Sequence, residues 1–289
     1  MEMMEPGIWR ITAPNPSPLT YKGTNSYLVE AEGLRAIIDP GPLDESHLSA
    51  LVSAIGDRPL THILITHAHL DHTPLARPLS DRTAAPILAF GPATAGRSRV
   101  MTDLAAAGLT GGGEGLDAGF IPDETLADGD CIGPIEAIHT PGHMGGHLCF
   151  ALGDVVFTGD HVMGWATSLV SPPDGDLTDF IASCARLQAR PARIFYPGHG
   201  DPITDPSDRL AWLVAHRKER EAQIRAALRE GGGSVPELTV RIYTDVAEHL
   251  LPAAERNVFA HLVDLCGRGL ASVTPRLGLA ATFGANSDT

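Results

Sequence analysis

The stretch "HILITHAHLDH", residues 62–72, constrains the fold of this chain more than any other. An apolar run typical of a buried strand ends directly in four potential metal ligands, His67, His69, Asp71 and His72. Burying these groups at a strand end is costly unless a metal ion or a charged partner compensates them. Ligands at alternate positions of a short loop can reach two neighbouring ions, unlike the pair four residues apart in a helical zinc motif. The stretch therefore predicts a metal site that needs further ligands.

Three further candidates follow three other apolar runs, each beside glycine. They are His143 in "TPGHMGGH", Asp160 in "VVFTGDH" and His199 in "YPGHG". Glycine permits the tight turn that directs a side chain inward from a strand end. We therefore predict that four strand ends meet and bring seven ligands into one centre.

The series H-x-H-x-D-H, TPGH, GD and PGHG resembles that of the metallo-β-lactamase superfamily over about residues 5–205. The resemblance implies an α+β fold, a four-layer αββα sandwich in which two mixed sheets pack face to face with helices outside. It also implies two divalent metal ions, with zinc as the expected metal and iron or manganese as alternatives. The implied ligands are His67, His69 and His143 for one ion, Asp71, His72 and His199 for the other, and Asp160 as a bridge.

The chemistry implied by this resemblance is hydrolysis. Two divalent ions that share a hydroxide supply a nucleophile at neutral pH, and they stabilise charge that develops in the transition state. Asp71 and Asp160 are the expected catalytic residues, Asp71 because its carboxylate can orient the bridging water or accept its proton.

Other residues near the motifs are candidates for supporting roles. Asp39 ends an apolar run and is expected to hydrogen-bond a ligand histidine such as His67 or His69. Two more histidines near the ligand turns are expected to support ligands or line the cleft, and three residues after Asp160 are candidates for substrate contacts. These are His147 and His161, and then Trp165, Thr167 and Ser168.

The character of the chain changes after residue 208. A long helix is expected over Arg209–Glu230, then shorter ones over Pro236–Tyr243 and about Pro252–Cys266, and a hairpin in "LASVTPRLGLAATF". Helices followed by such a hairpin resemble a winged-helix module. We predict two domains, a metal hydrolase domain over 1–208 and a small C-terminal winged-helix-like domain over 209–289.

Between the motifs, residues 94–120 are rich in glycine and alanine, and the part that reads "GLTGGGEGLDAG" lacks residues that favour a helix or a strand. We expect a mobile loop there that overhangs the site.

The ligands alone do not set the substrate, because one fold supports many reactions. The end of the chain resembles the branch that contains the endoribonuclease β-lactamase-like protein 2 and its bacterial homologues, which implies hydrolysis of a phosphodiester in single-stranded RNA. The alternatives are a glyoxalase-II-like thioesterase or esterase, then a mononuclear iron sulfur dioxygenase, then a non-catalytic nucleic-acid-binding protein.

Charge bears on these alternatives. The chain has 21 basic and 35 acidic residues, and most of the acidic excess lies before residue 209. This balance argues against strong non-specific nucleic-acid binding, which depends on phosphate neutralisation by Lys and Arg. Five basic residues of the long helix could contact RNA or form a solvated face. They are Arg217, Lys218, Arg220, Arg225 and Arg229.

The location and the partners follow from composition. The four scattered cysteines favour free thiols in a reducing compartment, and no apolar run is long enough to span a membrane. We expect a cytosolic protein that acts on a small molecule or RNA without a membrane partner, and its oligomeric state is left open.

Overall fold

Two mixed β-sheets form the centre of the protein in the computed structural model, which describes residues 1–244, 247 and 250–286. The first sheet contains β1 (Glu2–Glu5), β2 (Ile8–Thr12), β3 (Asn25–Ala31), β4 (Leu34–Ile38), β5 (His62–Leu64), β6 (Ile87–Ala89) and β7 (Glu124–Thr125), paired in chain order. The second contains β8 (Cys131–Ile132), β9 (Ile135–His139), β10 (Leu148–Leu152), β11 (Val155–Gly159) and β12 (Ile194–Pro197), in the order β12-β11-β10-β9-β8.

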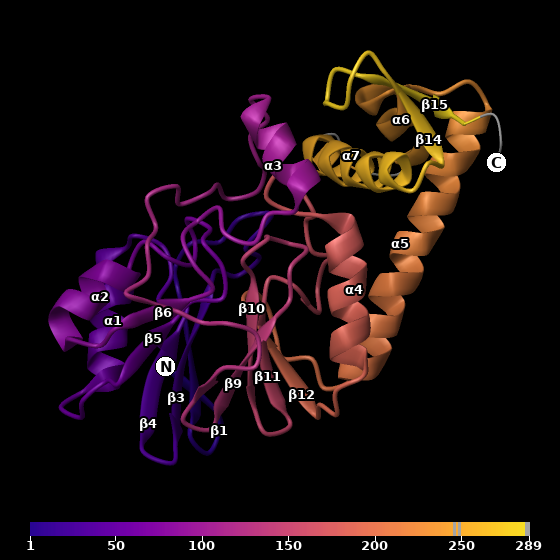
Figure 1. Cartoon of the computed structure of the whole chain (residues 1–289). Coiled ribbons are helices and arrows are strands. Elements are labelled where there is room, and N and C mark those ends of the chain that lie inside the picture. Colours follow the sequence, from indigo (N-terminus) through magenta and orange to yellow (C-terminus); the bar gives the residue numbers. More distant parts are fainter. Residues whose placement is uncertain (245–246, 248–249, 287–289) are drawn as a thin grey trace.

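Some of the helices cover the outer faces of the two sheets, and others pack in a separate C-terminal core (Figure 1). The helices are α1 (Glu45–Ile55), α2 (Ala76–Thr83), α3 (Arg99–Ala106), α4 (Leu177–Gln188), α5 (Pro206–Arg229), α6 (Val235–Ile242) and α7 (Leu251–Gly267). Figure 1 shows α1 and α2 against the first sheet, and α4 and α5 beyond the second. The predicted four-layer sandwich is therefore confirmed.

The alternation of apolar residues along the strands explains this layering. Ala36 of β4 and Leu64 of β5 pack with Phe150 of β10 between the sheets, whereas Ile37 and Ile63 face the other way and join the core under α1 and α2. Strands β4 and β5 thus each contribute to two cores, because successive side chains point to opposite faces. Each fully buried side chain of this kind stabilises the fold by about 1.5–3 kcal/mol.

The strand directions bring the predicted ligand turns to one edge. Strands β4, β5 and β6 are parallel, and β9, β11 and β12 also share one direction because β9 and β11 are both antiparallel to β10. Backbone hydrogen bonds join the two sheets at this edge, from Leu148 N to Thr66 O at 2.8 Å and from Asn25 N to Gly198 O at 2.7 Å. The loops after these strands therefore meet.

The helix starts agree with the capping residues in the sequence. Asp44 caps α1 and Asp176 caps α4, each through its carboxylate. Helix α5 begins three residues earlier than expected, because Asp205 caps it and Pro206 occupies its first turn, where no backbone N–H is needed.

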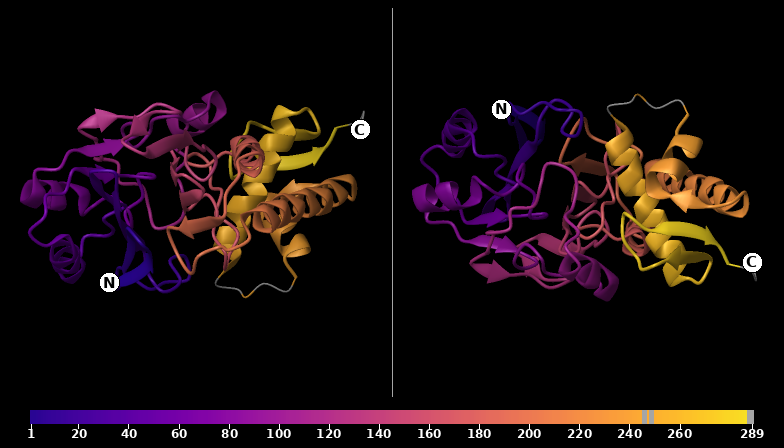
Figure 2. Two further views of the ribbon diagram at one scale, coloured as in Figure 1. Left: turned by 90° about the horizontal axis from the view of Figure 1, so that it is seen from below. Right: turned by 90° about the horizontal axis from the view of Figure 1, so that it is seen from above.

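The chain after α5 forms a separate apolar core, which lies to one side of the sandwich (Figure 2). Helices α6 and α7 pack there with a sheet of order β13-β15-β14, whose strands are β13 (Gly233–Ser234), β14 (Ala271–Thr274) and β15 (Thr282–Ala285). Phe259 of α7 meets Phe283 of β15 with their rings edge to face, 6.4 Å apart. The two predicted short helices and the hairpin are all present.

Helix α5 belongs to both parts. Leu210 and Leu213 pack in the core under α4, whereas Ile224 and Leu228 pack in the C-terminal core. The domain boundary at 208/209 stays a prediction. The last residues of the predicted C-terminal domain, 287–289, lie outside the described part of the chain.

The expectation for residues 94–120 needs a correction. The first half of this segment contains α3. Ser98 caps this helix, because its side-chain oxygen accepts a hydrogen bond from Met101 N. No helix or strand lies between Ala107 and Asp123, and the mobility of this loop stays a prediction. Every helix among the described residues is too short or too polar to cross a lipid bilayer.

Candidate metal centre

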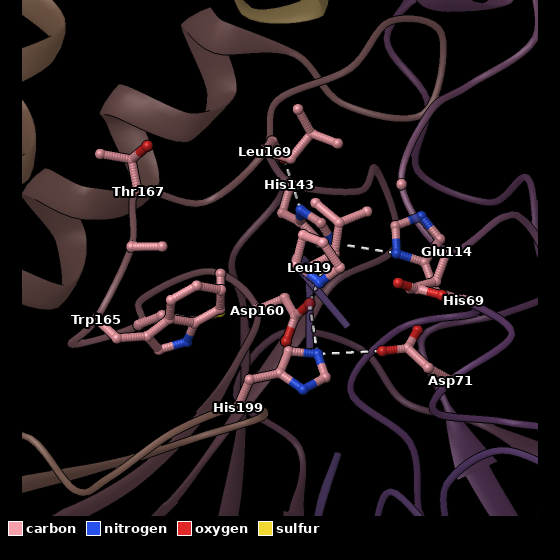
Figure 3. Close-up of a pocket in the computed structure, with 14 residues that line it drawn as sticks. Leu19, His69, Asp71, Glu114, His143, Asp160, Trp165, Thr167, Leu169 and His199 are labelled. Carbon is pink, nitrogen blue, oxygen red and sulfur yellow. Dashed lines mark hydrogen bonds and ion pairs between the residues drawn. The ribbon is translucent and has the colours of Figure 1, made fainter. Parts of the chain in front are cut away.

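The seven predicted ligands lie together, buried at the shared edge of the two sheets. They form two groups whose ligand atoms lie within 4.8 Å of one another: His67, His69 and His143, and Asp71, His72, Asp160 and His199. Figure 3 shows five of them at the floor of a pocket. The structure thus brings together every ligand that the motifs predicted, although their role as ligands stays a proposal.

In the first group, three ring nitrogens converge. His69 Nδ1 lies 3.0 Å from His67 Nε2 and 3.1 Å from His143 Nε2. Burial and the neighbouring His143 ring together lower the pKa of His69 to about 3. Burial also places the pKa of His67 well below its usual range. All three rings are therefore neutral at pH 7, as metal ligation requires.

Two of these rings are oriented through their other nitrogen. Thr66 Oγ1 lies 2.9 Å from His67 Nδ1, and the Leu169 carbonyl lies 2.7 Å from His143 Nδ1. Because a carbonyl can only accept, His143 carries its proton on Nδ1 and presents the lone pair of Nε2 to the centre.

In the second group, carboxylates alternate with histidines. His199 Nε2 lies 3.1 Å from Asp71 Oδ2 and 3.2 Å from Asp160 Oδ2, and His72 Nε2 lies 3.4 and 3.5 Å from the same two carboxylates. Asp160 Oδ2 is also 3.8 Å from His143 Nε2 of the first group. Asp160 therefore lies between the two groups, as expected of a bridging ligand.

The charges of the second group show what it can hold. Burial alone would lower the pKa of His199, but Asp160 and Asp71 outweigh it and raise this pKa to about 9. Burial likewise opposes charge on Asp160, but His199 and His72 hold its pKa well below the usual range. Without a metal ion, the carboxylates thus bind protonated imidazoles. A divalent cation can replace those protons.

Asp39 supports the second group instead of the first. Its carboxylate lies 2.9 Å from His72 Nδ1 and accepts hydrogen bonds from Thr66 N and Thr66 Oγ1. The expected hydrogen bond from Asp39 to one of the predicted ligand histidines is present, but the histidine is His72 and not His67 or His69. The reason is the parallel pairing of β4 and β5, which sets Asp39 beside Thr66, and a hydrogen bond from Gly41 N to His72 O, which folds the next turn over it.

Two glycines make room for the ligands. Gly159, before Asp160, has a φ of +47°, and an added Cβ would lie 2.7 Å from His147 Nε2. An added Cβ at Gly198, before His199, would lie 2.4 Å from Asp160 Oδ1. Both contacts are too close for any other residue, which explains why glycine stands beside these ligands.

The donor set fits a pair of divalent metal ions. His72 Nε2 and Asp160 Oδ1 are buried without a hydrogen-bond partner, which is costly in the absence of an ion. Imidazole and carboxylate ligands suit zinc, iron and manganese, and no cysteine belongs to either group. The cost of the buried polar atoms is thus explained by a dinuclear site.

A pocket opens above the ligands. Its walls are mostly apolar: Pro18, Leu19, Met163, Trp165, Ala166 and Leu169 line it together with Gly113, Glu114 and Thr167. Trp165 stacks on Tyr21 with their rings 4.9 Å apart.

The other predicted site residues divide between the pocket and the protein interior. Trp165 and Thr167 line the pocket, whereas Ser168 is buried and its hydroxyl donates to the His161 carbonyl at 2.8 Å. His147 lies behind the first group, with its ring 5.2 Å from His67 and its Nδ1 on Thr140 Oγ1. The ring of His161 is tilted against those of His147 and Phe180, 5.7 and 4.6 Å away, and is also buried.

Sequence reasoning missed several pocket residues. Leu19 and Leu169 have no motif, because an apolar residue in a loop gives no signal of its neighbours. Glu114 lies in the glycine-rich loop that was expected over the site, where Ser17 Oγ donates to its carboxylate at 2.7 Å. The loop was thus predictable as a pocket wall, but its charged residue was not singled out.

Comparisons with known proteins agree with this geometry. The family model of the metallo-β-lactamase superfamily matches residues 19–199, and that of the β-lactamase associated winged helix domain matches residues 234–278. The chain is 29% identical to the β-lactamase-like protein 2 homolog of Drosophila melanogaster, over 89% of this chain and 86% of that protein. It is 30% identical to the atrochrysone carboxyl ACP thioesterase AgnL7 of Paecilomyces divaricatus, over 85% and 73%.

Solved structures have the same fold. The metallo-β-lactamase family protein TTHA1429 of Thermus thermophilus superposes with a TM-score of 0.76 at 24% identity, and the match covers 98% of this chain and 100% of that one. The protein TTHA1623, solved in a di-iron-bound form, has a TM-score of 0.54 at 28% identity and covers 69% of this chain and 96% of its own.

Proposed function

The chain belongs to the metallo-β-lactamase superfamily and is a metal-dependent hydrolase, and from this premise we propose that it hydrolyses a thioester or ester with a largely apolar acyl group. The wall of the pocket carries the proposal. Within the described part of the chain, no lysine or arginine lines it, and Glu114 is its only charged residue besides the ligands. An apolar pocket with an added carboxylate favours a neutral substrate over a polyanion.

We assign the metals as two zinc ions, held by the two groups of ligands. When bound, the ions would lower the pKa of a water at the centre and polarise the acyl carbonyl oxygen. TTHA1623 holds two irons, so iron is the alternative that metal analysis must test.

The side chains of the site support specific steps. Asp71 lines the pocket, and His72 and His199 outweigh burial to keep its pKa below the usual range. Its carboxylate is therefore charged at neutral pH and can accept a hydrogen bond from the attacking water. Thr24 Oγ1, 3.4 Å from Asp71 Oδ2, helps to orient it. Trp165 and Leu169 would exclude other water from the acyl group.

A phosphodiester, with single-stranded RNA as the candidate substrate, is the second proposal. It is favoured by the similarity to the β-lactamase-like protein 2 homolog, which extends over nearly the whole chain. The acidic charge of the first part and the absence of cations at the pocket oppose it. The order of the two substrate classes is thus the reverse of the one that the sequence favoured.

The remaining alternatives rank lower for physical reasons. A mononuclear iron dioxygenase would leave the second group of ligands without an ion, and a non-catalytic binding protein would leave both groups uncompensated. The cytosolic location stays a prediction from the free cysteines.

A hydrolysis panel tests the substrate class. Metal-loaded protein and the variant Asp71→Ala are given acyl thioesters of increasing chain length, single-stranded RNA and a lactam. We expect turnover of apolar acyl thioesters that rises with chain length and is lost in Asp71→Ala. Cleavage of RNA alone would replace the first proposal by the second, and two metals without turnover of any substrate would reject both classes.

A further inference from the structure

Leu169 links the pocket wall to the metal centre. It lines the pocket, and its carbonyl holds His143 Nδ1 at 2.7 Å. Residues 160–176, between β11 and α4, contain no helix or strand. The position of this carbonyl therefore depends on contacts from other elements.

Two side chains from α5 and α7 hold the peptide groups on both sides of Leu169. Arg217 of α5 donates through Nη2 to the Ser168 carbonyl and through Nη1 to Asn257 Oδ1 of α7, the latter at 2.8 Å. The same Oδ1 accepts a hydrogen bond from Val170 N at 3.3 Å. The three hydrogen bonds form one connected network around Leu169.

Arg217 is costly to bury. It is 3% exposed and forms no ion pair with any described carboxylate, and burial lowers its pKa to about 10. Its guanidinium lies over the Phe180 ring at 5.2 Å. A buried cation without an anionic partner needs strong hydrogen bonds, and its acceptors are Ser168 O and Asn257 Oδ1. The expectation that this cation lies on an exposed face is thus wrong.

The same helices hold other parts of the pocket. Arg209 of α5 donates to the Met163 and Ala166 carbonyls at 2.7 and 2.6 Å. Arg256 of α7 donates to the Thr110 carbonyl at 2.7 Å, in the loop that leads to Glu114. Both walls of the pocket are therefore tied to the helices that follow the last ligand.

We propose that Arg217 and Asn257 are positioning residues of the metal centre. They fix the Leu169 carbonyl, which keeps the proton of His143 on Nδ1 and leaves Nε2 for a metal ion. The C-terminal helices then form part of the hydrolase site, in addition to any binding of their own. This inference rests on the proposed role of His143 as a ligand.

Zinc binding by the full-length, metal-free protein tests the inference, measured in competition with a chromophoric chelator. Arg217→Met and Asn257→Leu should lower the zinc affinity of one of the two binding steps by about 10-fold or more, as removal of a group that orients a metal ligand does in other proteins. Asn257→Asp keeps an acceptor oxygen and should restore both steps. Arg229→Met, which removes an exposed cation from the end of the same helix, should match the wild type.

The outcomes separate a positioning role from a merely structural one. If the variants melt at lower temperature but bind both zinc ions as the wild type does, the inference is overturned. If Arg217→Met does not fold, Asn257→Leu and Asn257→Asp decide. A wild type that binds no zinc would overturn the proposed function and this inference with it, whereas two zinc ions bound equally by all variants would overturn this inference alone.

Discussion

Buried histidines occur in both parts of the molecule, but their surroundings differ. His69 and His261 are each almost inaccessible, and burial lowers the pKa of each to about 3. His69 Nδ1 faces two other imidazole nitrogens, whereas neither ring nitrogen of His261 has a hydrogen-bond partner in the described part of the chain. A shifted pKa therefore does not identify a site. The convergence of several ligand atoms does.

The two parts also bury different kinds of groups. The sandwich concentrates seven ionisable ligands at one edge, and their mutual charges offset part of the cost of burial. The C-terminal core consists of side chains such as Leu238, Phe259 and Phe283, which need no partner. The first arrangement can bind an ion and a substrate, whereas the apolar side chains of the second contribute stability. Four predictions test this contrast.

We expect the largest loss of activity from a substitution between the two groups of ligand side chains. Asp160→Asn removes the charge that lies between the two groups of ligands, so we expect kcat to fall by at least about 10³-fold, in the range seen when one member of a catalytic unit is lost. Metal content per chain should fall as well. Asp154→Asn, the same change in an exposed turn before β11, is the control. Full activity with two metals in Asp160→Asn would contradict the bridging role.

The C-terminal core should lose stability without losing the site. Leu238→Ala deletes a fully buried side chain of α6 and should lower the free energy of unfolding by about 2–5 kcal/mol. Denaturant unfolding measures this, with Val240→Ala on the exposed face of α6 as the control. Loss of bound metal from the folded variant would show that the two parts are less separate than their cores suggest.

The pocket wall should affect binding more than chemistry. Trp165→Ala removes the largest apolar wall residue, so we expect KM for an apolar acyl thioester to rise about 10-fold, with a smaller change in kcat. Ile121→Ala, another exposed apolar residue that does not line the pocket, serves for comparison. An unchanged KM would mean that the acyl group binds elsewhere.

The smallest effect concerns His261 and pH. Its folded pKa of about 3 lies below the ordinary 6.5, so the unfolded chain takes up the proton first and stability is lost as the pH falls below 6.5. Each pH unit below that value costs up to about 1.4 kcal/mol for this one group. Unfolding of the wild type and of His261→Leu at pH 6.5 and 5.5 measures the difference. If the free energy of unfolding changed by the same amount between the two pH values in both proteins, the burial of a neutral His261 ring would be contradicted.

Much of the fold followed from local sequence patterns. The apolar runs that end in the ligand turns predicted the strands that lie next to the site. Strands β1, β2, β7 and β8 were not anticipated. Strands β7 and β8 are two residues long, and the exposed β1 lacks an apolar run. Helix α3 was missed because it lies within the segment 94–120, whose glycine and alanine content favoured a loop.

The sequence by itself identified the seven side chains that meet at the candidate metal centre. Each stands beside a glycine or in the dense "HAHLDH" turn, and these patterns are local, so they can be recognised along the chain. These local patterns are thus sufficient to predict a metal centre, but they do not set its substrate.

Only the tertiary structure decided what surrounds the ligands. The partner of Asp39 depends on the register of β4 and β5, and the burial of Arg217 depends on α7, which lies about forty residues further along the chain. The pocket also combines residues from six loops that are distant in the sequence. Such contacts are set by packing between elements, and no local pattern of residues encodes them.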